Sequence, residues 1–199
     1  MIYVRDDDVL VNSSAYTDKR KTPLERFKQI HRWICDTPKL LHVPTLVVEP
    51  LMSHPEAVEF ICSETEAGRM KPQIHGYEHI DYDQLSSNQV TEHLIKCKNF
   101  FWDQFGLVPT KWYTPWGANS SRLQFVASQQ GLELIDCSKI NKPGDILNTA
   151  YAGNDIEKFM DEKEIFIHWW ERGMRLKRIV EILRHGSVES AKAANKEWF

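Results

Sequence analysis

The feature that most constrains the fold is an alternation of short apolar, β-prone runs with longer amphipathic stretches, repeated about six times along the 199 residues. Residues 43–48 are apolar throughout, which is typical of a strand buried on both faces of a parallel sheet. Helices of moderate length with short connections favour crossover units between such strands. We therefore predict a single α/β domain over residues 1–199, with a parallel sheet that is either open or closed into a barrel.

The boundaries of these elements follow from apolar periodicity and from capping residues. A capping-box spacing at Thr22-Pro23-Leu24-Glu25 predicts the start of the first helix, with Pro38 just beyond its end. Gly106 is predicted to stop the longest helix. The predicted strands cover residues 2–4, 43–48, 72–74, 108–113, 132–135 and 164–167. The later helices are predicted at residues 55–67, 86–105, 121–130, 156–160 and 174–184.

Polar residues recur where these predicted strands end. Asp6-Asp7-Asp8 follows the first strand, and His75 stands at the end of the third. Thr114 to Gly117, Asp136 and His168 follow the fourth, fifth and last strands. In a barrel of parallel strands, sites lie at the carboxyl ends of the strands, so this distribution favours the barrel over the open sheet.

Two groups of residues supply the ligands of a hydrolytic metal site. His75 and His79 are four positions apart, so both imidazoles can face one divalent ion. Three consecutive carboxylates at Asp6 to Asp8 repel one another unless a cation or water neutralises them. Imidazole and carboxylate together predict a site for one divalent metal ion.

Composition excludes several classes of function. The net charge is −3 with the histidines neutral, which gives no electrostatic case for a nucleic acid or an anionic membrane as partner. The sequence contains no apolar run long enough for a membrane span, and Met1 leads directly into a strand-like run without a signal peptide. We therefore expect a cytoplasmic protein. The four cysteines form no CxxC pair and are expected to be reduced thiols.

Over nearly its whole length the sequence resembles the polysaccharide deacetylases, the NodB-homology group of carbohydrate esterases. Asp7-Asp8 matches the aspartate pair of that family, and His75 with His79 matches its HxxxH motif. The further matches are the loop Tyr113-Thr114-Pro115-Trp116-Gly117, Asp136, and the final motif Phe166-Ile167-His168. The resemblance implies a distorted (β/α) barrel with parallel strands and outer helices, forming one deacetylase-like catalytic domain.

The resemblance also implies an activity and a role for each residue. Asp8, His75 and His79 would bind Zn²⁺ or another divalent transition metal, and Asp7 would be the general base. His168 would protonate the leaving amine, oriented by Asp136. The reaction would remove an N-acetyl group from an amino sugar or saccharide and release acetate. The residues expected to contact this substrate are Tyr77, Tyr113, Pro115, Trp116, Trp169 and Trp170.

Three positions depart from the family pattern. The third carboxylate leaves the register open, so Asp6-Asp7 is an alternative aspartate pair. Tyr113 stands where the family loop begins with arginine, and Arg5 is a possible replacement in space. Val9 stands where glycine usually follows the aspartates.

Three alternative functions remain open from the sequence. His75-Gly76-Tyr77-Glu78-His79 also satisfies the H-x-x-E-H peptidase signature, which requires a helix with Glu78 as base. A related metal-dependent hydrolase of a non-sugar C–N bond would carry the same motifs, because the pocket loops determine specificity. A non-catalytic carbohydrate-binding protein with the same fold is the third. The substrate, the metal and the oligomeric state are not determined by the sequence.

Overall fold

The computed structural model describes residues 2–10, 21–37, 40–136 and 164–168, and also residues 181, 182, 184, 185, 190, 193 and 194. The predicted helix at 156–160 lies outside the described residues, as do Trp169 and Trp170. Of the predicted helix at 174–184, residues 181, 182 and 184 are described, and these are helical.

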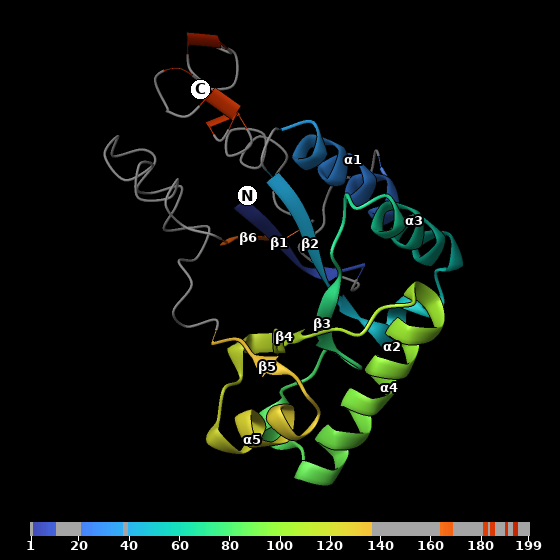
Figure 1. The fold of residues 1–199 in the computed structure, drawn as a ribbon, viewed down its shortest axis with the longest axis vertical. Coiled ribbons are helices and arrows are strands. Elements are labelled where there is room, and N and C mark those ends of the chain that lie inside the picture. The colour runs from blue at the N-terminus through green and yellow to red at the C-terminus, as the bar shows by residue number, and fades with distance from the viewer. Residues whose placement is uncertain are drawn as a thin grey trace. The chain divides into compact units, whose positions relative to one another are not determined.

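The strands form one sheet in the order β5-β4-β3-β2-β1-β6 (Figure 1). Their bounds are β1 Ile2–Val9, β2 Leu40–Val47, β3 Gln73–Gly76, β4 Lys111–Trp112, β5 Glu133–Leu134 and β6 Glu164–His168. The pairs β2–β3, β3–β4 and β4–β5 are parallel. Because two parallel strands that follow one another in the chain need a crossover connection, helices separate most of these strands along the chain. The predicted α/β class is confirmed.

The helices begin and end largely where the capping residues predict. They are α1 Pro23–Cys35, α2 Val48–Leu51, α3 Pro55–Glu66, α4 Ser87–Phe105 and α5 Ser121–Gln129. Thr22 and Glu25 form the predicted capping box at the start of α1. A second capping box joins Ser86 and Gln89 at the start of α4, and Gly106 ends that helix in the left-handed conformation.

Several strand boundaries differ from the prediction. β1 does not end at Val4 but continues through the three aspartates to Val9, and all three carboxylates are buried. Burial is tolerated because polar side chains of the protein, rather than solvent, face these carboxylates. β4 is limited to Lys111–Trp112, and Val48 begins the short helix α2 instead of ending β2.

By its internal contacts the chain divides into two compact units. One comprises Met1–Asp6, Ser13–His42 and Asn141–Phe199, and the other comprises Asp7–Asn12 and Val43–Ile140. In the first unit, α1 buries Phe27, Ile30 and Ile34 completely. The larger described part belongs to the second unit. The expectation of a single domain over residues 1–199 stays a prediction.

In the second unit, helices pack against the parallel strands around an apolar core. α4 contacts β3, α3 and α5, and Figure 1 shows α3 and α4 on the same side of β3. The core is formed by fully buried side chains from the strands and from α4, including Leu46, Ile74, Leu94, Phe101 and Trp112. This packing holds the carboxyl ends of β1, β2 and β3 in defined positions.

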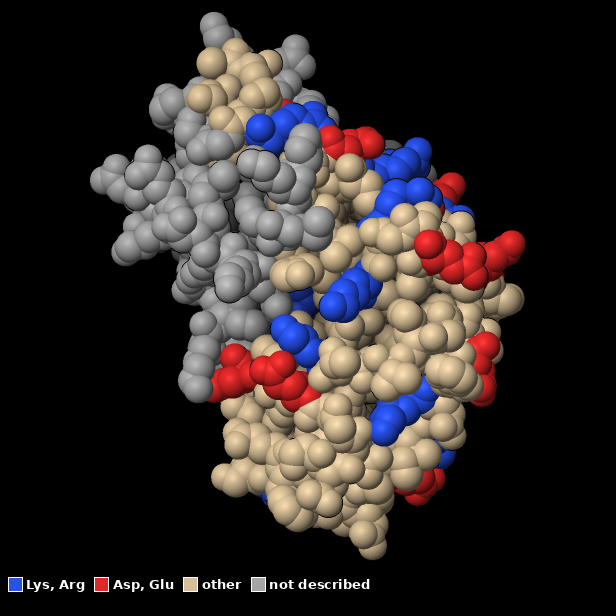
Figure 2. Space-filling view, in the orientation of Figure 1, with Lys and Arg blue, Asp and Glu red and all other residues tan. Residues whose placement is uncertain are grey.

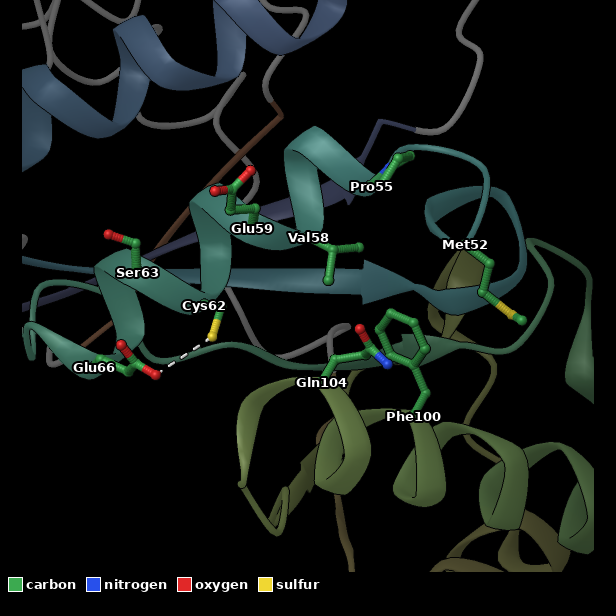
Figure 3. A pocket seen from close by; sticks show the side chains of 9 residues that line it. All are labelled: Met52, Pro55, Val58, Glu59, Cys62, Ser63, Glu66, Phe100 and Gln104. Carbon is green, nitrogen blue, oxygen red and sulfur yellow. Dashed lines mark hydrogen bonds between the residues drawn. The ribbon is translucent and has the colours of Figure 1, made fainter.

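The described surface carries charges of both signs. Figure 2 shows Lys and Arg side chains interspersed with Asp and Glu on the face drawn there. A hollow between α3 and α4 is lined by apolar side chains such as Val58 and Phe100 (Figure 3). The Cys62 thiol, which also lines it, donates a hydrogen bond to Glu66 Oε1 at 3.6 Å. This hollow contains none of the predicted site residues. Among the described residues, the helices are too short or too polar to cross a membrane.

Candidate metal centre

Three side chains of the second unit converge at the carboxyl end of β3. Asp8 lies near the end of β1, His75 lies on β3, and His79 lies in the turn that follows β3. Oδ1 of Asp8 lies 2.7 Å from Nε2 of His75 and 2.8 Å from Nε2 of His79. Within the described part of the chain, these residues form the one group of three or more possible metal ligands with donor atoms within 4.8 Å of one another.

The backbone at Asp8 adopts an unusual conformation that brings its carboxylate to the histidines. Its φ is +57°, in the left-handed region that non-glycine residues seldom occupy. Aspartate tolerates this region better than branched or bulky residues, although such a conformation still costs on the order of 1 to 3 kcal/mol. Local strain of this kind concentrates at functional sites, so it supports a functional role for Asp8.

The two imidazoles determine the charge state of Asp8. Burial is the largest single influence on this carboxyl group and raises its pKa. Hydrogen bonds and electrostatic attraction from His75 and His79 together outweigh burial and hold the pKa of Asp8 well below its ordinary value. Asp8 is therefore an anionic carboxylate at neutral pH, as a metal ligand must be.

Asp7 is held by a residue that the sequence interpretation missed. The Thr45 hydroxyl, on β2, donates to Oδ1 of Asp7 at 2.7 Å, and Thr45 is fully buried. This hydrogen bond fixes the direction in which the Asp7 carboxylate points. The two residues are 38 positions apart, so no local sequence pattern points to their contact.

Asp6, the third carboxylate, lies in different surroundings. Its Oδ2 is 3.5 Å from Nε2 of His42, within the first compact unit. Asp8, the second residue of the Asp7-Asp8 pair, is the aspartate that lies at the His75–His79 pair. Arg5 is buried on the same strand, two positions before Asp7. Its suggested role as a substitute for the loop arginine stays a prediction.

Among the described residues that were predicted to contact the substrate, Trp116 lies against His79, one of the three candidate metal ligands. Its ring meets His79 edge-on, with 4.9 Å between ring centroids, and 75% of Trp116 is exposed. Its φ of +59° turns the backbone sharply inside the short turn Pro115–Gly117. An exposed flat ring beside the ligands is suited to stack on a sugar face.

The other predicted substrate-contacting residues lie differently. Pro115 is buried, and Tyr113 is only 1% exposed. Tyr77 is half-buried against α4, where its ring meets His93 edge-on and Lys96 Nζ lies 4.9 Å from the ring centroid. The substrate role of all three residues stays a prediction.

The two predicted residues of the acid step lie at or beyond the ends of β5 and β6. Asp136 is half-buried just after β5. His168 is the last residue of β6, and its side chain lies outside the description. Their roles therefore stay predictions.

The geometry removes the peptidase alternative. That signature requires both histidines and the intervening glutamate on one helix. Here His75 lies on β3, residues 77–80 form a bend, and Glu78 is exposed.

The donor set fits a divalent transition metal. Two imidazole nitrogens and one carboxylate oxygen are the ligands of a catalytic site, where three protein ligands leave at least one position open. A structural site would be closed by a fourth ligand. The same donor types accept zinc, iron, cobalt or nickel, so the donor set does not identify the metal.

Comparison with known proteins shows the fold. No family model matches the sequence, and no curated protein matches it. Among solved structures, the chain is similar to a family 4 carbohydrate esterase from Streptomyces lividans in complex with acetate, with 15% identity and a TM-score of 0.63 over 99% of this chain and 88% of that chain. It is also similar to the peptidoglycan deacetylase PdaC from Bacillus subtilis, with 14% identity and a TM-score of 0.59 over 98% and 92% of the two chains.

A third similar structure is described as a pseudoenzyme rather than as an active enzyme. It is a family 4 pseudoenzyme from Bacillus anthracis, with 14% identity and a TM-score of 0.61 over 98% of this chain and 61% of that one. The chain thus has the α/β fold of the family 4 carbohydrate esterases, their distorted barrel, and the predicted fold is confirmed. Because a pseudoenzyme shares this fold, catalysis has to be argued from the residues of the site.

Proposed function

We propose that this protein is a metal-dependent hydrolase that removes an N-acetyl group from an amino sugar or saccharide. The observation that carries the proposal is the convergence of Asp8, His75 and His79 beside Asp7, on the fold of the family 4 carbohydrate esterases. The solved relatives include an esterase with bound acetate, which supports a substrate with an acetyl group. Zn²⁺ is the metal that we propose, because nitrogen and carboxylate ligands with an open position suit it.

In the first half of the proposed reaction, water is activated and attacks the carbonyl carbon of the acetyl group. A divalent ion held by Asp8, His75 and His79 would supply Lewis acidity, which polarises a carbonyl and acidifies water. Asp7 would accept a proton from the attacking water as general base, and the Thr45 hydroxyl orients its carboxylate. Backbone N–H groups near Trp116 would donate to the developing oxyanion, a contribution of roughly 3 to 4 kcal/mol in comparable sites.

The second half of the reaction requires an acid. His168 would donate a proton to the nitrogen as the C–N bond breaks, and Asp136 would orient His168. The products would be acetate and the free amine. Asp7 and His168 thus have complementary roles, which distinguishes a catalyst from a binding protein that needs neither a base nor an acid.

The test is acetate release from N-acetylglucosamine, its oligomers and nucleotide-linked forms by the metal-loaded protein. Asp7→Asn is expected to lower kcat by at least about 100-fold while leaving the bound metal in place, because a general base typically contributes that much. Asp103→Asn, an exposed position on α4, is the matched control. An Asp7→Asn variant with wild-type turnover would contradict the proposed base.

Extending the assay to non-sugar amides, and measuring sugar binding beside turnover, decides between the alternatives. Release of a product from non-sugar amides but not from acetylated sugars would favour the related amide hydrolase. Sugar binding without turnover, unchanged in Asp7→Asn, would favour the non-catalytic binding protein, which the similarity to a pseudoenzyme also supports. The cytoplasmic location and the lack of a nucleic-acid or membrane partner stay predictions.

A further inference from the structure

The turn between His75 and His79 encloses the hydroxyl of a buried tyrosine. Tyr82 is the first residue of the short turn η1 Tyr82–Gln84 and is fully buried. Its hydroxyl oxygen accepts the backbone N–H of Tyr77 at 2.8 Å and lies 3.4 Å from the carbonyl oxygen of Glu78, to which it can donate. Both backbone groups belong to residues between the two histidine ligands.

Gly76 provides the space that this hydroxyl occupies. A Cβ atom at position 76 would lie 2.8 Å from Tyr82 Oη and 2.8 Å from the Glu78 carbonyl oxygen. Contacts this short are essentially never found for a real Cβ atom. Glycine is therefore required by close approach, and the tyrosine and the glycine form one packed arrangement inside the turn.

The tyrosine ring is itself held by neighbouring elements. The ring meets Trp112, on β4, edge-on with 5.1 Å between centroids, and the Trp112 indole N–H donates to the carbonyl oxygen of His75 at 3.0 Å. Arg122, on α5, donates to the carbonyl oxygen of Tyr82 at 3.0 Å. Burial raises the pKa of the Tyr82 hydroxyl, with the nearby Cys97 thiol adding to the effect, so the hydroxyl keeps its proton at neutral pH.

We propose that Tyr82 is a positioning residue for the metal centre, which sets the separation of the His75 and His79 imidazoles by bracing the turn between them. The proposal rests on the metal site of the proposed function but not on the hydrolysis reaction. Groups that lie behind metal ligands and orient them typically change the metal affinity by about 10- to 100-fold when they are removed. Loss of the hydroxyl would leave the Tyr77 N–H without this acceptor and free the turn to change shape.

The first test compares Tyr82→Phe with the wild type and with Tyr3→Phe, a control that removes a tyrosine hydroxyl on β1. The dissociation constant for Zn²⁺ is measured by competition with a chelator, and the exchange rate of the Tyr77 amide is measured in the metal-free protein. Tyr82→Phe is expected to weaken Zn²⁺ binding by at least about 10-fold and to accelerate exchange of the Tyr77 amide. Tyr3→Phe is expected to leave the Zn²⁺ dissociation constant and the exchange rate of the Tyr77 amide within about twofold of the wild-type values. Unchanged Zn²⁺ affinity in Tyr82→Phe would overturn the proposal.

A double-mutant cycle provides the second test. Gly76→Ala should weaken Zn²⁺ binding because the added methyl group displaces the Tyr82 hydroxyl. In Gly76→Ala with Tyr82→Phe, the contact with the hydroxyl is gone, while those with the Glu78 carbonyl oxygen and Tyr82 Cε2 remain. The combined loss of Zn²⁺ affinity should therefore be smaller than the product of the two separate losses. If the fold-loss of Zn²⁺ affinity in the double variant equals the product of the two single losses, the two residues act independently, which would contradict the shared packing.

These outcomes are separable from the fate of the proposed function. A wild type that binds Zn²⁺ in a Tyr82-dependent way but releases no acetate would refute the hydrolase and leave the role of Tyr82 intact. Acetate release with Zn²⁺ affinity unchanged in Tyr82→Phe would do the reverse. A wild type that binds no divalent metal would overturn both.

Discussion

At the scale of single residues, the carboxylate of Asp7 accepts a buried hydrogen bond from the Thr45 hydroxyl at 2.7 Å. A carboxylate that serves as a general base must be both ionised and aimed at the attacking water. The polysaccharide deacetylases that the sequence resembles usually carry an arginine at the start of the loop that Tyr113 begins here. Thr45 is a hydrogen-bond donor to Asp7 that the structure shows directly.

Removing this donor should slow the chemical step more than it weakens substrate binding. Thr45→Val keeps the shape of the side chain but removes the hydroxyl. We expect kcat to fall by about 10-fold, because a hydrogen bond to a charged group contributes roughly 1.5 to 3 kcal/mol. KM and the metal content should stay nearly unchanged. Thr45→Ser should restore most of kcat. Thr110→Val, at an exposed position, is the control. Full kcat in Thr45→Val would show that the hydroxyl does not orient the base.

The sequence predicts the candidate metal ligands but not the residues that support them. The His75–His79 spacing and the position of Asp8 at a strand end lie within short segments, so the pattern shows them. Thr45 and Tyr82 act across the fold through side-chain contacts, and threonine and tyrosine are too common for their identity alone to indicate such a role. Only the packed structure brings Thr45 to Asp7 and the Tyr82 hydroxyl into the histidine turn.

At the scale of elements, α1 and β2 are joined by a buried histidine pair. Nδ1 of His31 lies 3.0 Å from Nδ1 of His42, and the Cys35 thiol lies 3.3 Å from Nε2 of His31. Asp6, on β1, faces the other nitrogen of His42 at 3.5 Å. Burial, with a further effect from His31, holds the pKa of His42 well below its ordinary value of 6.5, so His42 is neutral in the folded protein.

The histidine pair makes the free energy of unfolding depend on pH. Below pH 6.5 the unfolded chain protonates His42 while the folded protein does not, so the unfolded state binds more protons and stability falls as the pH falls. The free energy of unfolding, measured with urea, should include the full contribution of the neutral His42 above pH 6.5. Below pH 6.5 this free energy should fall by up to about 1.4 kcal/mol per pH unit.

The control for this dependence is a matched pair of substitutions. His42→Asn should flatten the decline between pH 6.5 and 5.5, whereas His54→Asn, at an exposed position, should leave it unchanged. The comparison concerns the slopes, because His42→Asn also alters packing at every pH. Equal slopes in the wild type and His42→Asn would refute the account of this pair.

Element boundaries were predictable where a local signal defines them. The capping boxes at Thr22 and Ser86 and the left-handed Gly106 are local, and the helices that they define were predicted closely. The end of β1 was not, because three adjacent aspartates resemble a solvated loop unless their buried partners are known. The short β4 and β5 depend on sheet pairing, which sequence periodicity does not resolve.

At the scale of the whole molecule, the repeated alternation of strand and helix was enough to predict the fold class. The structure and its likeness to the family 4 carbohydrate esterases agree on an α/β fold with parallel strands. That agreement does not extend to activity, since a pseudoenzyme of the same family has a similar TM-score. The proposed activity requires a metal ion at the three converging side chains, and acetate release then separates a hydrolase from a metal-binding protein without turnover.

The most direct measurement is the metal content of the purified, untagged protein, determined by mass spectrometry. We predict about one divalent transition-metal ion per chain, lost both in Asp8→Ala and in the His75→Ala, His79→Ala double variant, because three protein ligands are the set expected for a catalytic site. His54→Ala, which removes an exposed imidazole, should keep the ion. Absence of metal in the reconstituted wild type, or full metal content in Asp8→Ala, would contradict the metal centre.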